Sequence, residues 1–168
     1  MGIELVKAAT ITRPADTTAY ASGDLIANST TAGSVTPFTF AGGAVPYRAR
    51  RFILLTSNAT VTNKNYQLFL FSASPTVTNG DNGAFAVTAA DHGRLVGVFA
   101  STAALSTGGG SVNYFYCNDS AATSVNGWLE SRLPGTFYGL LRANAAYTPT
   151  SAETFNLAME GSLDGPYG

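Results

Sequence analysis

Residues 65–71 carry the clearest alternating pattern in the chain. Tyr66, Leu68 and Leu70 fall on one side of an extended backbone, and the other side holds Gln67 followed by two phenylalanines. Because one side is wholly apolar and the other nearly so, the pattern predicts a strand that is covered on both faces. Such a strand is typical of the inner part of a packed sheet sandwich.

The remaining hydrophobic patterns predict short strands separated by turn residues. We expect these strands at residues 3–12, 34–41, 47–57, 95–99, 112–118, 128–129, 136–142 and 152–160, and residues 20–26 are read as a turn that leads into a further short strand. Pro37 places its strand at a sheet edge, and the last two strands are read as a pair joined by residues 147–151. One helical turn is expected at residues 88–93, and no amphipathic helix. This spacing predicts an all-β fold, a single antiparallel sandwich or jelly-roll-like domain.

The N-terminal segment is predicted to be distinct from the body of the domain. Pro14 has no backbone N–H to donate to a strand ladder, so the first strand is expected to end near residue 13. We therefore expect residues 1–13 to form an arm or an edge strand and residues 14–168 to form the β-sandwich body. No repeat of fixed period divides the body further.

Charged residues make up only 11% of the chain, well below the roughly 25% that is usual in globular domains. The formal net charge of -1 provides no sustained positive field, so we expect no binding of nucleic acid. No run approaches the roughly 18 apolar residues of a membrane-spanning helix, so we expect no membrane span. Apolar residues at 45% with few charges predict that copies associate as a trimer or larger oligomer.

Candidate catalytic and metal-ligating residues are sparse. His92 is the single histidine and stands beside Asp91, with no Gly-x-Ser-x-Gly segment to present a nucleophile. The single cysteine, Cys117, ends an apolar strand pattern and is predicted to be a small buried core residue. Asp81, Asn82 and Asp91 carry oxygen ligands for calcium, but their spacing differs from that of a calcium loop. We therefore expect no enzyme, no cofactor and no metal.

The one cluster of like charge is basic and lies at the start of the strand at residues 47–57. Arg48 and Arg50 point to one side of this strand and Arg51 points to the other. These arginines could pair with acidic groups on a partner subunit. The competing interpretation is that they are solvated arginines at the start of a strand.

Carbohydrate binding is an alternative function for a β-sandwich with exposed aromatic side chains. The candidates are Tyr20, Tyr47, Tyr147 and Trp128. The competing interpretation is that these rings belong to the core, as aromatic residues on β-strands usually do.

Several stretches resemble a group of virion proteins of tailed bacteriophages. The first is TRPADTTAYASGDLI at residues 12–26, at the point where the β-rich body of that group begins. LFLFSASPT at residues 68–76 and DNGAF at residues 81–85 are similar to the middle of these proteins. FYGLL at residues 137–141 and AYTPTSAETF at residues 146–155 are similar to their end. The resemblance therefore covers most of the chain.

The resemblance implies a non-enzymatic capsid decoration (cement) protein. Such proteins bind the outside of the phage head and stabilise the shell, often as trimers. The expected partners are the major capsid protein and further copies of this chain, with synthesis in the cytoplasm of the host bacterium. Arg13 and Pro14 would lie in the arm that touches the shell or a neighbouring copy. A tail, neck or head-fibre component is the alternative role within the particle.

Overall fold

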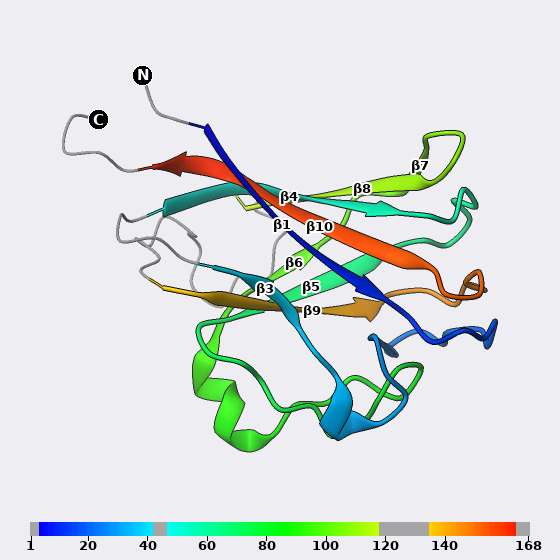
Figure 1. The fold of residues 1–168 in the computed structure, drawn as a ribbon, viewed down its shortest axis with the longest axis horizontal. Helices are drawn as coiled ribbons and strands as arrows, with labels where there is room; N and C mark the ends of the chain where they lie inside the picture. The colour runs from blue at the N-terminus through cyan, green and yellow to red at the C-terminus, as the bar shows by residue number, and fades with distance from the viewer. Residues whose placement is uncertain (1–3, 42–46, 118–134, 164–168) are drawn as a thin grey trace.

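The computed structural model describes residues 4–41, 47–117 and 135–163. They form two five-stranded antiparallel sheets that pack on each other as a sandwich (Figure 1). Sheet 1 runs in the order β1 (Glu4–Thr12), β10 (Thr154–Leu163), β4 (Tyr47–Thr56), β8 (Ser111–Tyr116) and β7 (Leu105–Ser106). Sheet 2 runs in the order β2 (Leu25–Ile26), β9 (Phe137–Ala143), β5 (Tyr66–Phe71) and β6 (Leu95–Ala100), and β3 (Phe38–Phe40) also pairs with β9. The predicted all-β sandwich is confirmed.

The core between the sheets follows from the two-residue period of the strands. In β5, Leu68 and Leu70 point into the sandwich and are fully buried. In β10, Phe155 and Leu157 do the same from the opposite sheet. Side chains at alternate positions of facing strands thus interdigitate in a single apolar layer.

Sheet 2 is apolar on its outer face as well, and loops of the same chain cover that face. Leu25, Phe71, Val77 and Leu140 form a second buried cluster there. The covering segments include the 3-10 helices η1 (Ala32–Ser34) and η2 (Ala89–Arg94), which lie on the side of sheet 2 that faces away from sheet 1 (Figure 1). The prediction that the strand at residues 66–71 is covered on both faces is confirmed.

The two covering loops approach each other so closely that one position requires glycine. A Cβ atom built on Gly80 would lie 2.0 Å from the backbone oxygen of Thr30. A larger residue at position 80 would therefore push the two loops apart. This close contact helps to seal the outer cluster of sheet 2.

Two of the sequence predictions need correction. The strands at residues 136–142 and 152–160 exist, but they do not pair with each other. β9 lies in sheet 2 and β10 lies in sheet 1, because the segment between them crosses from one sheet to the other. The helical turn at residues 88–93 is a 3-10 helix, and the Thr88 hydroxyl donates to the Asp91 carboxylate instead of accepting a backbone N–H. The strand expected at residues 128–129 lies outside the described residues.

The N-terminal segment is bound along its length to the body. β1 pairs antiparallel with β10 through nine consecutive residues, from Glu4 opposite Ser162 to Thr12 opposite Thr154. It is an edge strand of sheet 1. Within the part of the chain that the structure describes, no helix is long and apolar enough to cross a bilayer.

Cys117 follows β8 and is buried, as predicted. Burial in an apolar environment disfavours the thiolate and raises the pKa of Cys117 to about 12. At pH 8 the thiol is therefore protonated and shielded from reagents.

We expect Cys117 in the native protein to react with a thiol-specific reagent at pH 8 far more slowly than in guanidinium-unfolded protein. The measurement is the time course of thiol labelling by absorbance, with the unfolded protein as the control for full reactivity. Equal rates in the two states would contradict the buried placement of this thiol.

Candidate functional site

The buried ionisable groups are the first candidates for chemistry. Lys64 lies in the loop between β4 and β5, and its Nζ is 2.8 Å from Oε1 of Glu153, just before β10. The same Nζ donates to Oγ1 of Thr56 and to the backbone oxygen of Asn58, both at 2.9 Å, and to Oγ of Ser111 at 3.3 Å. The side chains of Lys64 and Glu153 are both 0% exposed. This cluster joins the ends of β4, β8 and β10.

The environment of Lys64 suits a structural ammonium group. Burial lowers the pKa of Lys64, and the Glu153 carboxylate opposes that shift. Nζ donates to four oxygen acceptors, and the side chain is fully buried. The Lys64–Glu153 pair therefore satisfies buried polar groups at the ends of β4, β8 and β10.

A second buried cluster joins the end of β1 to the loops over sheet 2. Nη2 of Arg13 lies 3.1 Å from Oδ2 of Asp81, and both side chains are 0% exposed. The Tyr20 hydroxyl donates to Oδ1 of Asp81 at 2.6 Å and accepts from Nε of Arg13 at 3.0 Å. The backbone N–H of Ala27 also donates to Oδ1 of Asp81 at 2.8 Å. Burial raises the pKa of Asp81, and these donors act against that rise.

The cluster changes the expected role of Arg13. Residues 1–13 were expected to include an arm on which Arg13 and Pro14 touch a partner. Arg13 is instead 2% exposed and is bound to Asp81 and Asp16 of its own chain, while Pro14 is half-buried. The Arg13 guanidinium therefore links the end of β1 to the loop that carries Asp81.

The structure describes the side chains of two of the three arginines in the basic cluster of β4. Arg51 is partly exposed on the outer face of sheet 1, where its Nε lies 2.6 Å from Oε2 of Glu160 on β10. Arg50 is exposed and stands at a register irregularity of β4, between Arg51 opposite Glu160 and Ala49 opposite Gly161. Arg48 belongs to β4 by its backbone, and its side chain lies outside the described part of the structure.

The aromatic residues considered for carbohydrate binding do not form an exposed row. Tyr20 and Tyr147 are buried and stack on each other with ring centroids 5.2 Å apart. The side chain of Tyr47 and all of Trp128 lie outside the described residues. The two rings that can be located therefore belong to the core.

The acidic residues considered as calcium ligands are engaged elsewhere. Asp81 binds Arg13, and Asp91 binds Arg94 at 3.0 Å. Asn82 adopts the left-handed region with φ of 61°, as expected in a turn. Over residues 4–41, 47–117 and 135–163, no group of three or more His, Cys, Asp or Glu residues is placed to hold a metal ion.

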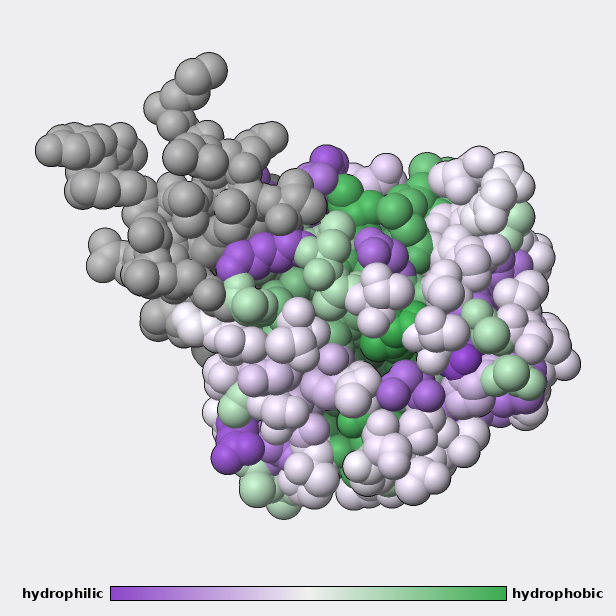
Figure 2. Space-filling model, viewed as in Figure 1, coloured by the Kyte–Doolittle hydropathy of each residue, from purple (hydrophilic) through white to green (hydrophobic). Residues whose placement is uncertain are grey.

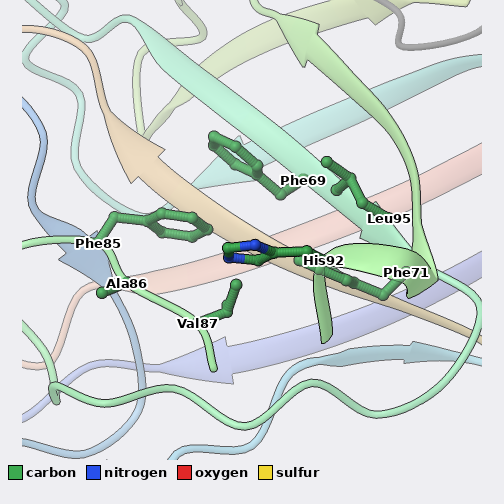
Figure 3. Close-up of a pocket in the computed structure, with 7 residues that line it drawn as sticks. All are labelled: Phe69, Phe71, Phe85, Ala86, Val87, His92 and Leu95. Atoms are coloured by element: carbon green, nitrogen blue, oxygen red, sulfur yellow. The ribbon is translucent and has the colours of Figure 1, made fainter. Parts of the chain in front are cut away.

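A pocket of about 390 Å³ opens between the outer face of sheet 2 and the loop that precedes η2 (Figure 3). It is lined by Phe69 and Phe71 of β5, Leu95 of β6, Phe85, Ala86 and Val87 of the loop, and His92 of η2. The Phe69 and Phe85 rings stack with centroids 4.2 Å apart. The His92 ring points toward Phe85 and Val87 across the pocket (Figure 3).

The lining of the pocket suits an apolar group and offers little chemistry. His92 is the one titratable side chain of the lining, and the remaining six residues are hydrophobic. General acid–base or nucleophilic catalysis would need a second polar group that orients the imidazole or attacks the substrate. The pocket can therefore enclose an apolar side chain or ligand, and the lining does not supply a catalytic set.

Asp91 fixes the short helix that carries His92. Its Oδ2 accepts from the Thr88 hydroxyl at 2.7 Å and from the backbone N–H of Thr76 at 2.9 Å. These hydrogen bonds, together with the charge of Arg94, lower the pKa of Asp91 below its usual value. The ionised carboxylate thus ties η2 to the segment that follows β5.

The outer face of sheet 1 carries three of the four exposed large hydrophobic residues of the described part of the chain: Leu55, Leu105 and Tyr116. We call it the sheet-1 face and define it by Ala8, Thr10, Arg51, Ile53, Leu55, Leu105, Val112, Tyr114, Tyr116, Asn156, Ala158 and Glu160. Strand register places these side chains in adjacent rows, because paired residues of an antiparallel sheet point to the same side. Figure 2 shows hydrophobic residues gathered over the region where Figure 1 places β4 and β8.

Comparison with protein-family models and with curated proteins found no match for this chain. The functional argument therefore rests on the residues and on the geometry described above.

We expect Glu153→Ala to lower the free energy of unfolding by about 3–5 kcal/mol, because it leaves the Lys64 ammonium buried without a counter-charge. The double variant Lys64→Met/Glu153→Leu should lose less, since it buries no charge. Urea-denaturation curves of the three proteins provide the measurement. A loss below about 1 kcal/mol in Glu153→Ala would mean that the pair is solvated, as exposed pairs are.

We also expect the effect of Asp91→Asn to depend on pH. The pKa of Asp91 is lower in the folded than in the unfolded protein, so its carboxylate stabilises the fold above the unfolded pKa of about 3.9. This contribution is lost as the pH falls through the folded pKa. The melting temperature of the variant should therefore lie below that of the wild type at pH 7 and approach it at the acid end of the titration. A gap that stays constant with pH would exclude this role for the charge.

Proposed function

We propose that this chain is a non-enzymatic structural component of a tailed-bacteriophage particle, a decoration protein that binds the outer capsid surface and stabilises the shell. The observation that carries the proposal is the strand order. The sheet with strand order β1-β10-β4-β8 packs against the sheet with strand order β2-β9-β5-β6. This connectivity is that of a jelly roll, which recurs in viral capsid domains and also in lectin-type domains.

The resemblance to phage virion proteins supports the proposal because the stretches that carry it meet in space. Arg13 and Tyr20 belong to the first stretch and bind Asp81 of another. Tyr147, from the last stretch, stacks on Tyr20 of the first stretch. The shared residues thus build the fold. They support a common architecture more directly than a common role, because one fold serves many functions.

The surface chemistry supports a protein that works by contact. The described residues bring together no set of groups suited to catalysis, and the pocket on sheet 2 is almost wholly apolar. With a formal net charge of -1, copies of the chain repel one another little when packed closely on a shell. Many weak contacts, repeated over a lattice, would strengthen the shell through avidity.

The partners in this proposal are the major capsid protein and further copies of this chain. The protein would be made in the cytoplasm of the host bacterium and would act on the outside of the head. A tail, neck or head-fibre component uses the same kind of fold and surface, and differs in copy number and position.

We expect purified native particles to contain this polypeptide in a number that matches the symmetry-related sites of the capsid lattice. Quantitative mass spectrometry gives the copy number, and an electron-microscopy map of the particle gives the position. A handful of copies at one vertex or along the tail would favour the alternative role. Absence of the polypeptide from particles would overturn the proposal.

A further inference from the structure

The two sheets of the sandwich differ in how their outer faces are covered. The outer face of sheet 2 lies under loops of the same chain, which bury Phe71 and Leu140. In the described part of the chain, the sheet-1 face carries exposed apolar side chains instead. An exposed apolar patch on a folded domain is typical of a site that binds another molecule.

The exposed large hydrophobic residues are concentrated on the sheet-1 face. Four such residues occur among the described ones: Leu55 at 45%, Leu105 at 58%, Tyr116 at 41% and Val61 at 37% exposure. The first three belong to the sheet-1 face, on β4, β7 and β8. Val61 lies apart from them, in the loop between β4 and β5.

Strand register joins these side chains into a continuous stripe. Leu55 of β4 lies opposite Val112 of β8, which in turn lies opposite Leu105 of β7. The next row along the strands places Ile53 opposite Tyr114. The first row crosses three strands and the second crosses two, and neither row contains a charged residue. Val112 is itself buried, so the exposed apolar surface of the first row comes from Leu55 and Leu105.

The charges of the sheet-1 face are already neutralised within the chain. Arg51 and Glu160 are its charged members, and they form an ion pair with each other. Arg51 also lies over the Tyr114 ring, with its guanidinium carbon 5.7 Å from the ring centroid. Two such faces can therefore meet without like-charge repulsion, and arginine and tyrosine are residues that interfaces favour.

The size of the sheet-1 face fits a stable contact. Strands spaced about 4.8 Å apart, with a rise of about 3.3 Å per residue, give the five strands a surface of roughly 600 Å². A stable interface takes about 600–1,000 Å² from each partner. The face is thus large enough for a specific interface, and sheets that meet face to face pack about 10 Å apart.

We propose that the sheet-1 face binds a second copy of this chain. A second copy is the partner that the face fits best, because the whole chain has a formal net charge of only -1. In a face-to-face contact, the same apolar stripe is present on both copies. In any other contact, the stripe meets another low-charge surface of the same protein. This inference extends the proposed function by naming the surface through which copies meet. It is tested on the purified protein alone, so its failure and the failure of the virion role are separate results.

The test is the mass of the purified protein in solution, measured by light scattering and by sedimentation at micromolar concentrations. The chain has a mass of 17.3 kDa. We expect the wild type to have the mass of at least two chains. Leu55→Glu and Tyr116→Glu should each weaken the association at least about tenfold, the effect of removing a central interface residue. Val61→Glu is the matched control, because it places the same charge on an exposed hydrophobic residue outside the face, and it should associate as the wild type does.

Circular dichroism and a melting curve for each variant separate loss of association from loss of the fold. If a glutamate variant does not fold, Leu105→Ser provides the milder change at the most exposed of the four positions and should also weaken association. A wild-type protein with a mass of 17.3 kDa at these concentrations would overturn the proposal. So would folded face variants that associate as tightly as the Val61→Glu control.

Discussion

The structure depends on the need to cover sheet 2 on both sides. β5 places Leu68 and Leu70 toward the sandwich core, and its other side carries Phe69 and Phe71. Two phenylalanines facing water would expose a large apolar area next to β9 and β6. The segments around η1 and η2 remove most of that area from water. The molecule therefore has three layers: sheet 1, sheet 2 and the loops that cover the outer face of sheet 2.

Loops pack less regularly than sheets, and this explains the buried charges. The loop that carries Asp81 is held by Arg13 from the end of β1, and η2 is held by Asp91 through Thr88 and Thr76. Buried ion pairs add little net stability compared with an apolar core, but each fixes one arrangement, because a misplaced loop would leave a charge without its partner. The pocket beside Phe69 and Phe85 lies where the loop layer meets the sheet incompletely.

The outer face of sheet 1, unlike that of sheet 2, carries exposed apolar side chains in the described part of the chain. Its outer face combines an internal ion pair, Arg51 with Glu160, with exposed Leu55 and Tyr116. The loops around η1 and η2 lie over sheet 2, and in the part of the chain that the structure describes Leu55, Leu105 and Tyr116 remain exposed on sheet 1. A protein that acts by association requires such a division, with one face closed by its own loops and the other kept for a neighbour.

Patterns along the chain are enough to predict those elements whose evidence is local. The period of two in residues 66–71 and in residues 152–160 identified β5 and most of β10, and the sparse charge pointed to a neutral surface. The burial of Cys117 also follows from its position beside an apolar strand. These features depend on neighbours along the chain, so pattern and composition are sufficient to predict them.

Which distant residues meet follows from the folded arrangement of the strands. Nothing in the spacing of Arg13 and Asp81, or of Lys64 and Glu153, distinguishes these charges from the solvated ones, because pairing depends on strand order and not on sequence distance. The same reason explains why β9 and β10, adjacent in the chain, lie in different sheets. It also explains why the exposure of Leu55, Leu105 and Tyr116 on one face could not be predicted. Side chains gather on a face only after register has aligned three strands.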